Sequence, residues 1–153
     1  MSFRYKVIFI SAFCLLLVIF IIIQYPSSDK NIVIVIFQTD EENVSFKCRV
    51  ANDDQSRHRG LLDVTFLELD NGMLFSYPAA EIRVFTMKDM KVPLDIIFID
   101  QNLTVIQIVE ADIGEEYIRS IYPVQFVVEI NQGIAKENDI KIGSKVNVKN
   151  RFK

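Results

Sequence analysis

The chain has 153 residues, half of them hydrophobic, and contains 17 Lys and Arg against 20 Asp and Glu. This length is typical of one globular domain. From residue 31 onward there are 14 basic and 19 acidic residues, a formal charge of −5, and this argues against nucleic-acid binding, which needs clustered basic charge on the domain.

An apolar segment without charged residues, VIFISAFCLLLVIFIII, occupies residues 7–23. As a helix it would rise roughly 25 Å, slightly less than the ~30 Å hydrocarbon core of a bilayer, and a tyrosine at each end can lie at the interface. Arg4 and Lys6 precede the segment, so the positive-inside rule keeps this end in the cytoplasm. We therefore expect residues 1–24 to be a single-pass signal anchor in the cytoplasmic (inner) membrane, with the rest of the chain outside.

A cleaved signal peptide begins in the same way, with basic residues before an apolar run. Signal peptidases need small residues at the first and third positions before the cut. A cut after Ser28 leaves Pro26 at the third position, and a cut after Ser27 leaves Tyr25 there. The sequence thus favours an uncleaved anchor, and a secreted form is the alternative.

Beyond the anchor the apolar residues recur with period two, and β-branched and aromatic residues dominate, as in β-strands. Residues 25–43 are either a stalk or contain a first strand at residues 32–37, and residues 44–153 form the globular domain. Alternation predicts half-buried strands at residues 44–50, with Cys48 on the apolar face, and at residues 82–87.

Further strands are predicted where apolar residues run almost without interruption, which indicates coverage on both faces. These runs are residues 94–100, 103–110 and 123–130. Residues 100–102 predict a tight hairpin, and residues 146–148 a closing strand.

Two short helices interrupt the β pattern. Asn52 and Gln55 have the spacing of a capping pair, and Gly60 after three basic residues is a stop signal. Residues 134–139 predict a second helical turn. After Ile140 the chain has five cations and no acid, which is typical of a solvated final strand or of a segment attracted to anionic lipid headgroups.

Five motifs occur in order along the domain: RHRGLL at residues 57–62, GMLF at 72–75, FTMKD at 85–89, PLDIIFID at 93–100 and VEINQG at 128–133. With these motifs, residues 44–148 resemble the domain of unknown function 192 family. The resemblance implies a compact β-sandwich or barrel-like fold and implies no activity. The chain departs from the family pattern at Thr86, where the family has Trp, at residues 89–90 and at Leu62.

The family motifs also contain residues with expected structural duties. Glycines beside apolar stretches indicate turns, and a proline before an apolar run indicates entry into a strand. Methionines in an apolar β domain are more often packing residues than ligands of cuprous ion. The residues are Gly60, Gly72, Met73, Met87, Pro93, Gly133 and Gly143.

Four charged residues lie beside or within apolar sequence: Arg57, Lys88, Asp95 and Glu129. Buried charges need partners, so the four residues either neutralise one another as an internal network or surround a shallow pocket. In the pocket, the two cations hold an anionic or hydroxyl-rich ligand and a carboxylate accepts from it. Asp95 and Glu129 are also candidate acid and base groups.

No cofactor or metal is expected, because His58 is the only histidine and no Cys or His pair has zinc spacing. The expected function is a membrane-tethered extracytoplasmic binding or accessory module, with the bilayer as partner through residues 7–23 and an envelope protein or glycan as a further partner. A small envelope enzyme acting on a polysaccharide or peptide through Asp95 and Glu129 is the alternative, and an assembly protein is a third hypothesis.

Overall fold

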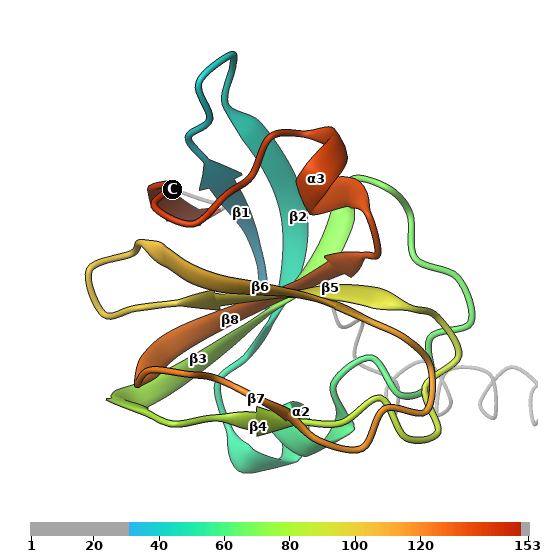
Figure 1. Cartoon of the computed structure of the whole chain (residues 1–153). Helices are drawn as coiled ribbons and strands as arrows, with labels where there is room; N and C mark the ends of the chain where they lie inside the picture. Colours follow the sequence, from blue (N-terminus) through green and yellow to red (C-terminus); the bar gives the residue numbers. More distant parts are fainter. Residues whose placement is uncertain (1–30, 151–153) are drawn as a thin grey trace, which may run out of the picture. The chain divides into compact units, whose positions relative to one another are not determined.

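The computed structural model describes residues 31–150, most of which form β-structure (Figure 1). The predicted anchor at residues 7–23 lies outside the described residues. Between residues 31 and 150, none of the helices has the length and apolar character that crossing a membrane requires. In chain order the elements are β1 (Ile32–Phe37), β2 (Val44–Ala51), α2 (Asp54–Arg59), β3 (Asn71–Glu81), β4 (Val84–Phe85), β5 (Leu94–Ile99), β6 (Val105–Ala111), β7 (Ile118–Arg119), β8 (Val124–Asn131), α3 (Ile134–Glu137) and β9 (Val146–Asn150).

Seven strands form one sheet in the order β6-β5-β8-β3-β2-β1-β9, and β4 pairs with β7 in a separate ribbon. All neighbours in the large sheet are antiparallel except β2 and β3. These two strands are parallel because the chain crosses between them through α2. Figure 1 shows α2 and the β4–β7 ribbon together at the lower end of the view and α3 at the upper end.

The large sheet curls until the start of its edge strand β6 meets the chain just before and at the start of β9. At the start of β6, the amide of Val105 donates to the carbonyl of Ser144 at 3.0 Å, and its carbonyl accepts from the amide of Gly143 at 2.8 Å. The amide of Val146 in β9 donates to the carbonyl of Leu103 at 2.8 Å. The prediction of a mainly β fold with short helices is confirmed. Of the two predicted architectures, a sandwich or a barrel-like fold, the curled sheet is closer to the second and forms a half-barrel.

Buried side chains cover both faces of the sheet. The first core lies inside the curl and takes residues from β1, β2, β3, β5, β8, β9 and α3, including Cys48, whose pKa burial raises to about 12. The second core lies on the opposite face and is closed by residues from β4, β7 and the segment after α2. All six residues of β5 are therefore buried, as predicted. The same prediction is wrong for β6, which is half-buried because it is an edge strand.

Local boundaries differ from the predictions at several points. The N-cap of α2 is Asp53 rather than Asn52: its carboxylate accepts from the amide of Ser56 at 2.8 Å, and the Ser56 hydroxyl accepts from the Asp53 amide at 3.3 Å. Within residues 82–87 only β4 pairs as a strand. Residues 32–37, for which a stalk and a first strand were both expected, form β1, which pairs with β2 and β9. Strand β3 was not predicted.

The motif glycines have two different roles. Gly60, Gly133 and Gly143 have positive φ, as turns require. Gly72 lies inside β3, where a Cβ would be 2.5 Å from the carbonyl oxygen of Glu129. Its predicted turn is wrong, since the glycine serves the close packing of β3 against its neighbours. Met73 and Met87 are buried in the second core, and Pro93 directly precedes β5.

Candidate functional site

Glu129 is a buried carboxylic acid in the centre of the sheet. It pairs in register with Met73 of β3 and Ile96 of β5, so its side chain lies on the face of the second core. The residue is 5% exposed. Within residues 31–150 its carboxyl has no hydrogen bond and no ion pair, and burial raises its pKa from 4.5 to about 8. The acid is therefore mostly protonated at neutral pH.

The Glu129 side chain reaches a pocket of about 380 Å³ between α2, β3 and the loop around β4. We call this hollow the Glu129 pocket. Its other lining residues are Asp54, Arg57, His58, Arg59, Leu61, Leu62, Phe75, Tyr77, Val84, Phe85, Thr86, Lys88 and Met90. A polar floor within apolar and aromatic walls, with cations at the mouth, is the usual composition of a small-molecule site.

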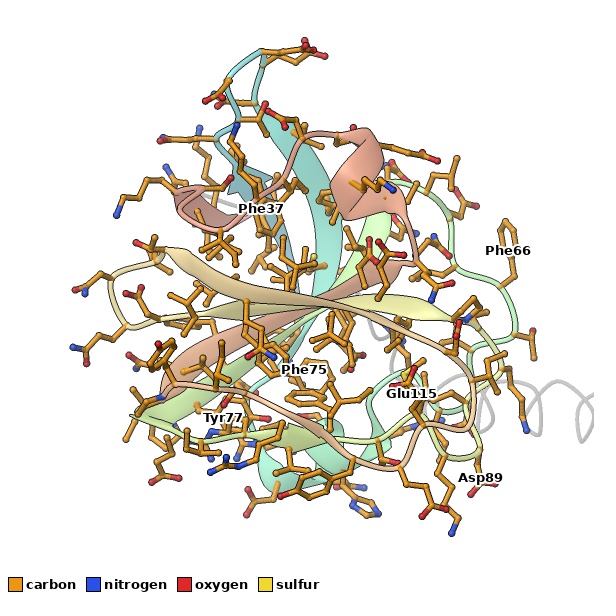
Figure 2. The ribbon with its side chains drawn as sticks, viewed as in Figure 1. Phe37, Phe66, Phe75, Tyr77, Asp89 and Glu115 are labelled. Atoms are coloured by element: carbon orange, nitrogen blue, oxygen red, sulfur yellow. The ribbon has the colours of Figure 1, made fainter. Side chains whose placement is uncertain are left out.

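Aromatic rings hold the walls of the Glu129 pocket in place. Phe75 of β3 meets Phe85 of β4 edge to face, with ring centroids 5.1 Å apart, and Phe85 in turn meets Phe98 at 5.9 Å. Tyr77, two positions after Phe75 on β3, also lines the pocket, and Figure 2 labels both side chains in the same part of the domain. Burial raises the pKa of Tyr77, and the charges of Arg83 and Arg57 partly offset this rise.

Arg57 is fixed against the wall of the pocket by three contacts. It donates to the carbonyl of Ser76 at 2.9 Å and to Asp54 at 2.6 Å, and its guanidinium lies 5.1 Å from the centre of the Tyr77 ring. Its side chain is 17% exposed, whereas that of Asp54 is fully exposed. The guanidinium is thus pre-oriented, and its partner Asp54 is free to exchange for a ligand anion.

Lys88 lies at the exposed margin of the same pocket. Its ammonium is 3.5 Å from Glu116, and both side chains are well over half exposed. Such an ion pair contributes little to stability, so Lys88 is available to an incoming anion. The cations of the predicted internal network pair with Asp54 and Glu116, and within residues 31–150 neither pairs with Glu129.

Asp95 lies outside the Glu129 pocket, and the prediction that it shares a site or charge network with Glu129 is wrong. It stands opposite Ile130 in the β5–β8 register, while Glu129 stands opposite Ile96, so the two carboxyl groups lie on opposite faces of the sheet. Asp95 accepts from the amides of Gly133 at 3.0 Å and Ala135 at 2.8 Å. Burial raises its pKa, and these two hydrogen bonds oppose the rise.

Other pocket residues were not identified from the sequence. Phe75 and Tyr77 belong to β3, whose pattern did not predict a strand. Asp54 precedes Arg57 by three positions on a helix, a spacing that does indicate an ion pair. Thr86, which stands where the family pattern has Trp, also lines the pocket, and its smaller side chain leaves more room.

The residues considered for soft-metal binding are divided between the two faces. Cys48 lies in the first core, and Met73, Met87 and Met90 lie in the second. In the described part of the chain, no group of three or more His, Cys, Asp and Glu side chains is arranged to hold a metal ion.

Residues 35–148 match the family described as DUF192, Uncharacterized ACR. The chain belongs to this family. Four of the five motifs that carry the DUF192 resemblance, all except residues 93–100, contribute lining residues to the Glu129 pocket. The motif residues therefore converge on one site.

Two solved structures resemble the domain. A Novosphingobium aromaticivorans protein of unknown function is 30% identical, with a TM-score of 0.73 over 76% of this chain and 84% of that protein. A Sinorhizobium meliloti protein, proposed to be a transcription regulator, is 28% identical, with a TM-score of 0.73 over 76% of this chain and 93% of that protein. No curated protein matches.

Proposed function

We propose that the DUF192 domain of this chain is a small-molecule binding module, tethered by residues 7–23 to the outer side of the cytoplasmic membrane. One observation carries the binding function. Glu129 is 5% exposed as a residue, its carboxyl has no hydrogen-bond or ion-pair partner within residues 31–150, and its side chain lines a pocket. A buried polar group without a hydrogen bond is costly, and such a cost is typical of functional sites.

The composition of the pocket indicates the chemistry of its ligand. A protonated Glu129 donates one hydrogen bond and accepts others, which suits a hydroxyl, carbonyl or amide group. Phe75 and Phe85 contact an apolar body, and Arg57 and Lys88 at the mouth attract an anionic group. A small hydroxy, keto or amide acid has all three features.

The rival hypothesis, an enzyme with two catalytic carboxylates, has only Glu129 at the pocket, because Asp95 lies on the other face of the sheet. Acid and base catalysis by Asp95 and Glu129 needs both carboxyl groups at one substrate, and the sheet lies between them. A role in transcription, proposed for the Sinorhizobium meliloti relative, gains no support from this domain's formal charge of −5.

A thermal-shift screen tests the binding function. The domain is heated with a panel of hydroxy acids, keto acids, amides and simple sugars at neutral pH, and a compound that binds the native state raises Tm. We expect at least one acid to raise the Tm of the wild type, and its effect to be lost in Glu129→Leu and weakened in Arg57→Ala.

Glu110→Leu on β6 is the matched control, because Glu110 is exposed and lies outside the pocket. This variant should respond to the compound as the wild type does. A compound that stabilises Glu129→Leu and the wild type equally would show that the buried acid plays no part in binding.

A further inference from the structure

The face of β9, β1 and β2 that neither core of residues 31–150 covers has a row of isoleucines with cations on both sides. In the strand register, Ile34 stands opposite both Lys47 of β2 and Lys149 of β9, and Ile32 stands opposite Arg49. Directly opposed residues project from the same face of a sheet. We call the following residues the basic face: Ile32, Ile34, Ile36, Lys47, Arg49 and Lys149.

Nothing in the two cores accounts for these isoleucines. Ile32, Ile34 and Ile36 are half-buried and belong to neither core, whereas their neighbours Val33 and Val35 are buried in the first core. The three cations are exposed. An apolar strip bordered by cations on a domain with an overall charge of −5 indicates a contact surface for an anionic partner.

Counter-charge on the domain itself is limited. Lys47 pairs with Asp70 at 2.7 Å, and both side chains are about half exposed, so this ion pair is weak and readily exchanged. The remaining positions opposite Ile36, namely Ser45 and Asn147, are neutral. The face therefore keeps a positive potential.

The position of the basic face in the chain identifies the partner. β1 is the first strand, and only eight residues separate Ile32 from the apolar segment that ends at Ile23. Nine peptide steps reach at most about 30 Å. The end of β9 lies beside the start of β1, since Asn150 pairs with Val33, and two further basic residues follow it in the sequence.

We propose that the basic face binds the anionic headgroup surface of a lipid bilayer and so holds the domain flat against the membrane. The cations contact lipid phosphates, and the isoleucines insert at the interface. Each cation near an anionic bilayer strengthens binding roughly five-fold. The geometry rests on the tether proposed above and is independent of the Glu129 pocket.

Vesicle co-sedimentation of residues 31–153 tests the proposal. This segment is a compact unit that contains both cores. We expect it to bind phosphatidylcholine vesicles only when they contain phosphatidylglycerol, with salt weakening the binding. Replacing Lys47, Arg49 and Lys149 by Ala should weaken vesicle binding on the order of 100-fold at low salt. Ile34→Ser should weaken the part of the vesicle binding that remains at high salt.

A triple alanine variant of Lys91, Arg119 and Lys136 is the control, because it removes three exposed cations from other parts of the domain, outside the Glu129 pocket. It should bind vesicles as the wild type does, and both triple variants should keep the wild-type Tm. Absence of vesicle binding by the wild type, or an equal loss in both triple variants, would overturn the proposal.

A duplex oligonucleotide separates lipid from nucleic acid. Tighter binding to duplex DNA than to anionic vesicles, lost in the basic-face variant, would overturn the lipid assignment and make the partner a nucleic acid. Neither vesicle nor DNA result affects the thermal-shift outcome at Glu129, so failure of the basic face is distinguishable from failure of the binding function.

Discussion

At the scale of single residues, Glu129 and Asp95 are carboxylic acids with similar burial and different surroundings. Asp95 is 1% exposed and receives two backbone hydrogen bonds. Glu129 is 5% exposed and receives none from residues 31–150. The first carboxyl is part of the framework, and the second destabilises the framework that contains it.

The pH dependence of stability should reveal the cost of Glu129. Because its folded-state pKa is raised from 4.5 to about 8, its penalty grows as pH rises above 4.5 and is complete above about 8. The penalty is about 3 kcal/mol at pH 7. Glu129→Gln removes it, so the variant should gain about 3 kcal/mol on the wild type between pH 5 and pH 8.

Denaturant unfolding of both proteins across this range measures the difference directly. Comparing variant with wild type cancels the contributions of the other carboxyl groups. A difference that stays constant with pH would mean that Glu129 titrates normally and that its carboxyl is solvated.

Asp95 should behave in the opposite way. Asp95→Ala leaves the part-buried amide of Gly133 and the buried amide of Ala135 without an acceptor at the start of α3, which costs about 2–4 kcal/mol. We expect a large fall in Tm with no change in the stabilisation by a pocket ligand. Unchanged stability with loss of the ligand effect would instead place Asp95 in the binding site.

At the scale of elements, the sequence predicted the identity of most strands but not how their faces combine. The apolar runs of β5 and β8 were correctly read as covered on both faces. Their register was not predictable, and a shift of one residue would bring Asp95 and Glu129 to the same face. The predicted four-residue site is therefore wrong at Asp95, because the face on which Asp95 lies depends on the β5–β8 register and not on the local sequence.

Strand β3 was missed because its sequence, NGMLFSYPAAE, contains Gly and Pro and a run of four buried residues rather than an alternation. It pairs with β2 in parallel and β8 in antiparallel, and such long-range pairing overrides local preference. Because β3 was not predicted, Phe75 and Tyr77, which line the pocket, were not identified as site residues.

A substitution at Gly72 tests how closely β3 packs against β8. In Gly72→Ala the new Cβ would meet the backbone oxygen of Glu129 at 2.5 Å, so the central strands must separate and we expect a loss of about 3 kcal/mol in unfolding free energy. Gly114→Ala is the control, because its Cβ has no neighbour within 4 Å and only its φ of +93° is strained, at a cost of about 1 kcal/mol. Equal losses in the two variants would mean that the strands accommodate the methyl group.

At the scale of the whole molecule, residues 31–150 contain both cores, and the pairing of β1 with β9 brings the first and last strands together. In the proposed arrangement, the predicted anchor and the basic face contribute separately to the position of the domain, one through the bilayer core and the other at its surface.

Salt and detergent extraction separates these two contributions. An apolar helix in the bilayer resists high salt, whereas a surface held by cations is released as the charges are screened. The full chain should stay with membranes at high salt and dissolve only with detergent, and a chain lacking residues 1–24, expressed with an exchanged cleavable signal, should be released by salt alone. Protease added to intact spheroplasts should digest the domain of the full chain. Release of the full chain by salt would mean that residues 7–23 are not an anchor, and digestion only after lysis would place the domain in the cytoplasm, where the anionic leaflet facing the basic face is the inner one.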